Sequence, residues 1–169
     1  MISLNELLND ETIKEEYKKS FLLNMFQKIC SKMDKDEYIK THIRQIYRES
    51  FDKVETTKNI IKKHLNYELS QDEAECMLVW FEANFRKKPN RKTLALSLRQ
   101  ELVKKQNGRC AACGEQLNDD LKKIHIDHII PWKLVGDELK DNFQALCETC
   151  NECKSAKTDY IFRSLIKLV

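Results

Sequence analysis

The sequence is poor in the residues that interrupt regular structure, with three glycines and two prolines among 169 residues. Glycine and proline are the residues that most often end helices and strands. The composition therefore favours helices that are seldom broken. Hydrophobic residues make up 41% of the chain and charged residues 34%, which is typical of a folded protein with a well-solvated surface.

Long hydrophobic runs are also absent. No apolar stretch of the sequence approaches the roughly 20 residues that a helix needs to cross a bilayer. The N-terminal stretch MISLNELLNDETIK lacks both the basic start and the long apolar centre of a secretory signal. We therefore expect a cytoplasmic protein that does not bind membranes.

The first half of the sequence has the hydrophobic periodicity of amphipathic helices. Ser70 and Glu73 form a capping-box pattern, which predicts the start of one of them. Pro89 interrupts the helical pattern, so we place a boundary between a helical region, 1–88, and a second region, 89–169. The apolar positions expected to form the helical core include Ile13, Tyr17, Phe21, Met25, Ile29, Ile39, Ile43, Ile46, Tyr47, Phe51 and Val54.

The net charge of +3 is unevenly distributed along the chain. Residues 1–88 contain 16 Lys/Arg and 16 Asp/Glu, whereas residues 86–109 contain nine basic residues and one acidic residue, Glu101. Such a basic segment is typical of a phosphate-binding surface. It contains a predicted basic helix over 93–106, which Asn107 and Gly108 should end.

Four of the seven cysteines form two CxxC pairs, which are separated by 33 residues. In a cytoplasmic chain, this pattern indicates metal binding rather than disulfides. Four thiolates satisfy a tetrahedral structural zinc and leave no open position for substrate. We therefore expect zinc to stabilise a segment too small to have its own core, with Cys153 as a bystander. The expected ligands are Cys110, Cys113, Cys147 and Cys150.

The residues between the two pairs carry a second pattern, HIDHIIPW at 125–132. The stretch IDHIIP, followed by DNFQALC and CETCNECK, resembles the HNH endonuclease family. The resemblance covers 109 to about 158 and implies a ββα-metal finger. The expected fold is therefore α+β, with an N-terminal helical region followed by a small zinc-stapled ββα-metal domain.

The resemblance implies a role for each motif residue. His128 matches the family's general base, and imidazole is suited to accepting a proton from water near neutral pH. Asp127 and Asn151 match the ligands of a catalytic Mg²⁺ or Mn²⁺. Asn142 would pin the loop between the strands and orient the His128 ring. His125 lies two positions before Asp127 and is expected to have a structural or phosphate-contact role.

Arg109 and Lys154 flank this motif and are expected to contact phosphates, as are Lys104 and Lys105 in the basic segment. One geometric problem remains at the sequence level. Adjacent residues of a strand face opposite sides, so Asp127 and His128 can share one site only if the strand twists or ends there.

The predicted function is metal-dependent hydrolysis of nucleic-acid phosphodiesters, with double-stranded DNA as the favoured substrate. Restriction, phage defence or mobile DNA would suit such an enzyme. The alternative is a non-catalytic zinc module that binds nucleic acid or a partner protein. The helical region would serve as a DNA-reading arm, a homodimer interface or a docking surface for a partner subunit. Its neutral charge disfavours a broad DNA contact.

Overall fold

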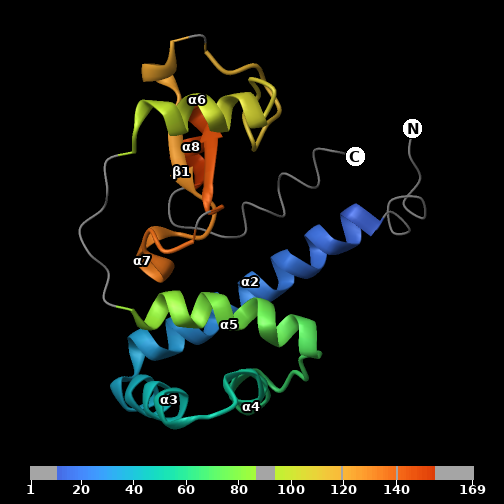
Figure 1. Ribbon diagram of the computed structural model, residues 1–169, viewed down its shortest axis with the longest axis vertical. Helices are drawn as coiled ribbons and strands as arrows, with labels where there is room; N and C mark the ends of the chain where they lie inside the picture. Colours follow the sequence, from blue (N-terminus) through green and yellow to red (C-terminus); the bar gives the residue numbers. More distant parts are fainter. Residues whose placement is uncertain (1–10, 87–93, 119, 140, 155–169) are drawn as a thin grey trace. The chain divides into compact units, whose positions relative to one another are not determined.

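The computed structural model describes residues 11–86, 94–118, 120–139 and 141–154 (Figure 1). The chain divides into two compact units, one of residues 21–88 and one of residues 89–169 together with the N-terminal 20 residues. The described structure is mostly helical, with one two-stranded sheet near the C-terminus, which confirms the expected α+β class. None of the helices described here combines the length and the apolar character needed to cross a membrane.

The unit of residues 21–88, which we call the helical unit, is formed by helices whose ends are marked by side-chain caps. Asp36 accepts hydrogen bonds from the backbone N–H groups of Tyr38 and Ile39. Ser70 and Glu73 form the predicted capping box, which is confirmed. The helices are α2 (Glu11–Lys35), which begins in the other unit, α3 (Glu37–Glu49), α4 (Lys53–Leu65) and α5 (Gln71–Phe85).

The core of this unit is apolar and partly aromatic. Phe26 and Phe81 are fully buried, and their rings meet edge to face with centroids 5.2 Å apart. The expectation that Tyr17, Phe21 and Phe51 belong to the core was wrong, because their exposed fractions are 40%, 47% and 107%. Four-residue spacing turns about 40° per step around a helix of 3.6 residues per turn. A long stripe at this spacing, such as the one that contains Tyr17 and Phe21, therefore leaves the buried face, whereas Phe51 lies between α3 and α4.

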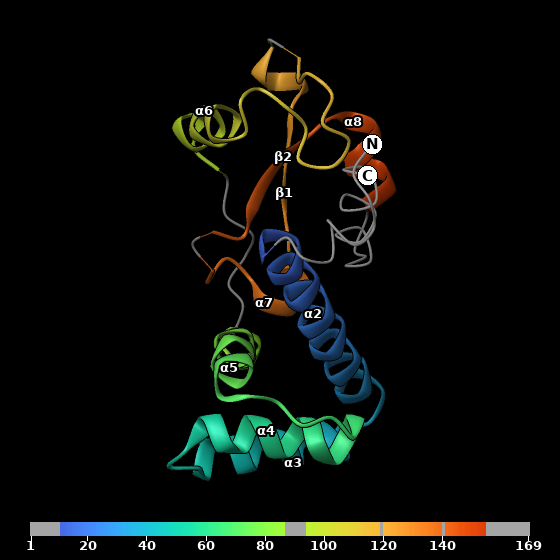
Figure 2. The same ribbon diagram turned by 90° about the vertical axis from the view of Figure 1, so that its right-hand side faces the viewer.

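The second unit is built around an antiparallel hairpin. The strands β1 (His125–His128) and β2 (Phe143–Leu146) pair so that His125 faces Leu146 and His128 faces Phe143. α6 (Leu96–Lys105) packs against β2, and α8 (Glu148–Lys154) packs against β1. Figures 1 and 2 show these two helices on opposite sides of the hairpin. The connections contain a 3₁₀ turn (Leu121–Lys123) and the short helix α7 (Trp132–Val135).

The basic helix α6 begins at Leu96, whereas part of the predicted segment, up to Thr93, lies outside the described residues. Its end is as predicted, since Asn107 and Gly108 adopt left-handed φ angles of 54° and 70°. A Cβ atom at Gly108 would lie 2.7 Å from the Gln116 side-chain nitrogen. The backbone angle therefore favours glycine, and a Cβ atom would also require the flexible Gln116 side chain to shift.

Candidate functional site

The two CxxC pairs come together into one cluster. The Sγ atoms of Cys110, Cys113, Cys147 and Cys150 all lie within 4.8 Å of one another. The first pair is shaped by a tight turn in which the Gly114 N–H donates to the Cys110 carbonyl at 3.0 Å. Cys153 is exposed and lies outside the cluster, as expected of a bystander. Such a four-sulfur arrangement can hold a metal such as zinc.

The surroundings of the four sulfurs favour a bound cation. Burial tends to raise the pKa of Cys110, but backbone N–H groups of Cys113, Cys147 and Ala112 offset this effect and lower the pKa to about 7. Burial and the neighbouring thiols raise the pKa of Cys150. The cluster therefore has one readily ionised sulfur and resists further negative charge. A metal ion would supply the positive charge that all four thiolates need.

One face of β1 is directed toward α8. The Asn151 side-chain nitrogen lies 3.3 Å from His125 Nδ1. One turn further along the helix, Lys154 Nζ donates to Asp127 Oδ2 at 2.6 Å and to the His128 carbonyl at 2.6 Å. His125 and Asp127 are two positions apart on one strand and therefore share a face. Asn151 and Lys154 of α8 both contact this face.

Lys154 occupies a different environment from the one expected. Its side chain is 1% exposed, and the paired Asp127 side chain is 18% exposed. A buried ammonium must be paired and hydrogen-bonded. A carboxylate oxygen of Asp127 and the backbone carbonyl oxygen of His128 are its partners. The structure places Lys154 as a buried partner of Asp127, and the phosphate contact that we expected of it stays a prediction.

The His128 ring is held by a group that the sequence did not reveal. His128 Nε2 lies 2.9 Å from Asp137 Oδ1, and the two side chains are 5% and 6% exposed. Trp132 Nε1 donates to the other Asp137 oxygen at 3.1 Å. The ring also lies against Phe143, with centroids 4.6 Å apart. This arrangement fixes both the position and the tautomer of the imidazole.

Asn142 connects the ends of the two strands. Its side chain accepts from the Ile130 N–H at 2.7 Å and donates to the Ile130 carbonyl at 2.9 Å. Its own carbonyl accepts from the Ile129 N–H at 2.9 Å. These bonds pin the loop after β1 and involve no atom of the His128 ring. The His128 ring contacts Asp137 instead, and an orienting role of Asn142 stays a prediction.

Asp127 and His128 are directed to different neighbours. Asp127 contacts α8, whereas the His128 ring contacts Asp137 and Phe143. β1 ends at His128, which is one of the two solutions that the sequence allowed. The backbone carbonyl of His128 nevertheless accepts a hydrogen bond from Lys154, so a single buried ammonium links the two residues.

The remaining basic residues predicted to contact phosphate are exposed. Arg109 donates to the Gly114 carbonyl at 3.0 Å and so also supports the first CxxC turn. Lys105 lies 3.9 Å from Asp141, with both side chains strongly exposed. Lys104 is exposed on the last turn of α6. Phosphate binding by Arg109, Lys104 and Lys105 stays a prediction.

The metal-binding atoms between β1 and α8 suit a hard divalent cation. Asp127 offers a carboxylate and Asn151 an amide oxygen, and such oxygen ligands are the ones that Mg²⁺ accepts together with water. His125 adds an imidazole nitrogen beside Asn151. Sequence reasoning placed His125 near the site only by its position on the strand. Its contact with Asn151 is a finding of the structure.

Comparison with known proteins agrees with this geometry. Residues 110–157 match the family model described as HNH endonuclease. No curated protein and no solved structure matches the chain. The C-terminal part of the chain therefore carries an HNH endonuclease domain, which confirms the resemblance seen in the sequence. The match begins at Cys110 and includes every residue of the sulfur cluster and of the hairpin.

Proposed function

We propose that this protein is a metal-dependent endonuclease that hydrolyses phosphodiester bonds of nucleic acid, with double-stranded DNA as its substrate. The match of residues 110–157 to the HNH family makes a nuclease the best-supported class. The observation that carries the proposal further is the buried pair of His128 and Asp137. A histidine fixed by a carboxylate is a common arrangement of a general base.

His128 would accept a proton from the attacking water. Asp137 already occupies Nε2, so Nδ1 is the ring nitrogen that remains for the water. The negative charge of Asp137 would stabilise the imidazolium that forms, as carboxylates do in related dyads. Trp132 holds the second Asp137 oxygen, so the carboxylate cannot rotate away from the ring.

The other motif residues would hold and shape the site for a Mg²⁺ or Mn²⁺ ion. Asp127 and Asn151 are the proposed ligands, and the ion when bound would supply positive charge to the phosphate. Lys154 balances the Asp127 charge and ties the end of α8 to the end of β1. Zinc at the four cysteines would stabilise this small domain and take no part in the chemistry.

Replacing Asp127 by alanine tests the proposed metal site. Purified protein should nick or linearise supercoiled plasmid in the presence of Mg²⁺ or Mn²⁺. Asp127→Ala should lose most of this activity, and excess Mn²⁺ should restore part of it, because the variant lacks a ligand rather than the base. Asn151→Ala should show a milder loss, since a neutral amide contributes less charge. Metal titrations of the cleavage rate would measure both effects.

A control separates a lost ligand from a lost fold. Zinc content and the thermal unfolding curve should be recorded for each variant, because Asp127 is also the partner of the buried Lys154. The double variant Asp127→Ala with Lys154→Met removes both charges and should recover stability without recovering activity at low Mg²⁺. If Asp127→Ala cleaved at the wild-type rate at a low Mg²⁺ concentration, Asp127 would be excluded as a metal ligand.

A non-catalytic zinc module is the rival function, and one observation favours it. The Asp127 carboxylate is already neutralised by Lys154, as in a purely structural ion pair. Such a module would bind nucleic acid or a partner protein without cutting. Absence of cleavage of both DNA and RNA under all metal conditions, with zinc and fold intact, would establish this alternative.

The exposed lysines of α6 are proposed to bind DNA phosphates. Each phosphate contact contributes about −0.9 to the slope of log K against log salt concentration for duplex DNA. Replacing Lys104 and Lys105 by glutamine should therefore make the slope shallower by about one to two units. Binding titrations at several salt concentrations would measure it. An unchanged slope would place the DNA path elsewhere.

The helical region, 1–88, is proposed to act in recognition, dimerisation or docking of a partner subunit. One HNH site has one general base, so cutting both strands would need a second copy, supplied most simply by a two-fold dimer. We also propose a cytoplasmic location, because two CxxC pairs in one segment indicate metal binding rather than disulfides. Restriction, phage defence or mobile DNA remains the proposed setting.

A further inference from the structure

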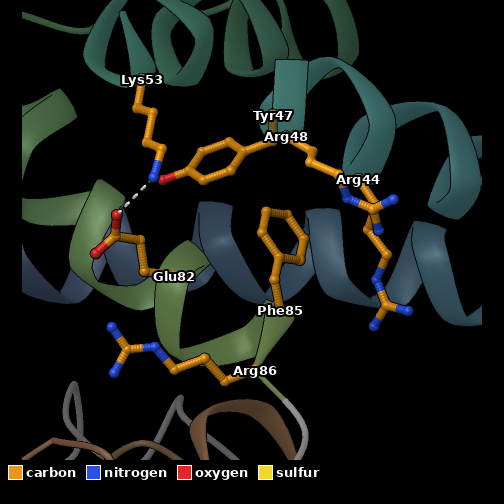
Figure 3. Close-up of a pocket in the computed structure, with 7 residues that line it drawn as sticks. All are labelled: Arg44, Tyr47, Arg48, Lys53, Glu82, Phe85 and Arg86. Atoms are coloured by element: carbon orange, nitrogen blue, oxygen red, sulfur yellow. Dashed lines mark hydrogen bonds and ion pairs between the residues drawn. The ribbon is translucent and has the colours of Figure 1, made fainter. Parts of the chain in front are cut away.

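The helical unit contains a pocket that lies outside the HNH domain. It has a volume of about 350 Å³ and is formed by residues of α3, α4 and the C-terminal end of α5 (Figure 3). This volume lies in the range of small-ligand sites, which is roughly 300 to 1,000 Å³. The residues that line it are Arg44, Tyr47, Arg48, Lys53, Glu82, Phe85 and Arg86.

The lining is strongly basic although the helical region as a whole is neutral. Four of the seven lining residues are cationic, and only Glu82 is acidic. Glu82 forms an ion pair with Lys53, whose Nζ lies 3.4 Å from Oε1. Among the described residues, no ion pair includes Arg44 or Arg48. The pocket therefore retains positive charge that a ligand can neutralise.

Two of the four cations, Arg44 and Lys53, lie near aromatic rings. The Arg44 guanidinium lies 6.0 Å from the centroid of the Phe85 ring, and Lys53 Nζ lies 5.7 Å from that of Tyr47. The two rings themselves meet edge to face at 4.9 Å. Cation–π contacts of this kind reduce the freedom of long side chains without neutralising them. The Arg44 guanidinium is therefore positioned before any ligand arrives.

Tyr47 supplies a neutral donor at the pocket. Its hydroxyl oxygen is buried beside Thr57, and no hydrogen bond of normal geometry to it is found in the described part of the chain. Burial and the negative charge of Glu82 both raise the pKa of Tyr47, so its hydroxyl keeps its proton. Figure 3 shows the hydroxyl directed toward the Lys53 ammonium. A buried donor with a poorly placed acceptor costs free energy, and an oxyanion in the pocket would offer a better acceptor.

We propose that this pocket binds the phosphate groups of a nucleic-acid strand or a nucleotide. Guanidinium groups suit phosphate because they donate paired hydrogen bonds to its oxygens, and two of them, Arg44 and Arg48, lie one turn apart on α3. A single carboxylate would leave most of the charge uncompensated, whereas a polyanionic phosphate ligand balances it. The proposal is independent of cleavage, since no residue of the HNH domain takes part.

The test compares two variants with the same change in charge. Arg44→Gln with Arg48→Gln removes two cations of the pocket, and Lys28→Gln with Lys35→Gln removes two exposed lysines of α2 outside it. Binding is measured without added divalent cation, using a short DNA duplex over a range of salt concentrations and, separately, ADP and pyrophosphate by calorimetry. Thermal unfolding of both variants checks the fold. Tyr47→Phe adds a third variant that removes only the hydroxyl.

Nucleic acid as the ligand predicts a salt slope shallower by about two units in the arginine variant and an unchanged slope in the lysine control. A nucleotide as the ligand predicts that the arginine variant loses ADP or pyrophosphate binding while the control keeps it. Either result supports phosphate binding by the pocket. Tyr47→Phe should then weaken the binding of the same ligand by about tenfold. The proposal is overturned if the two double variants behave alike toward every phosphate probe. It is equally overturned if the arginine variant differs only in binding an acidic polypeptide such as polyglutamate.

Discussion

His128→Ala is expected to lower the cleavage rate by about 10²- to 10⁴-fold, the usual cost of removing a general base. The fold, the zinc and DNA binding should be retained, because the ring lies at the end of β1, where it contacts Asp137 and Phe143, and far from the sulfur cluster in the sequence. Excess Mg²⁺ or Mn²⁺ should not restore the rate, since the missing group accepts a proton and binds no metal. Single-turnover cleavage of plasmid at several metal concentrations would measure this.

Asp137→Asn is the matched variant of the same pair. Asparagine keeps the size of the side chain and a hydrogen-bonding oxygen, but it removes the charge that would stabilise the imidazolium. We expect a smaller loss than in His128→Ala, with kcat lowered and KM little changed. A reduction of KM and kcat alike, or normal cleavage by His128→Ala, would contradict the proposed base. Metal rescue of His128→Ala as strong as that of Asp127→Ala would contradict it as well.

The sequence was sufficient to identify the motif but not the partners of its side chains. The spacing of the CxxC pairs and the stretch HIDHIIPW led to the sulfur cluster and the hairpin, because both signals are local. Asp137 was missed because it lies in a loop, and only the folded chain brings it to His128. Nothing in the residue type or its spacing separates it from the exposed acidic residue Glu138 beside it.

Burial of charge was the second feature that the sequence did not predict. A lysine near the end of a short helix is normally exposed, yet Lys154 is 1% exposed. Its burial depends on Asp127 and on the His128 carbonyl, and both lie on another element. Tyr17, Phe21 and Phe51 show the opposite error, since apolar residues at nearly helical spacing were assigned to the core. Whether such a side chain is buried depends on its partners and on the direction in which it leaves the helix, and both are set by the folded structure.

Cys147→Ser is expected to cause loss of zinc together with unfolding of the HNH domain. Binding of a structural zinc supplies about 10 to 16 kcal/mol in small zinc domains, and a serine hydroxyl is a far poorer ligand than a thiolate. The apolar core around the cysteines is small and includes the cluster itself, with Cys110 packed beside Leu117, Ile124, Ala145 and Leu146. Metal analysis and amide exchange of the hairpin would detect the loss.

Cys153→Ser is the control for that experiment, because it makes the same chemical change one turn of α8 beyond the cluster. Cys153 is exposed and belongs to no metal-binding group of the described residues, so its replacement should alter stability by no more than about 0.5 kcal/mol. The helical unit has its own aromatic core around Phe26 and Phe81 and should stay folded in both variants. Loss of hairpin protection in Cys147→Ser alone would therefore locate the effect in the zinc site. A fully folded, zinc-free Cys147→Ser protein would show that the hairpin is stabilised by its side-chain contacts, chiefly Lys154 with Asp127 and Asn142 with Ile130, and that the metal is dispensable.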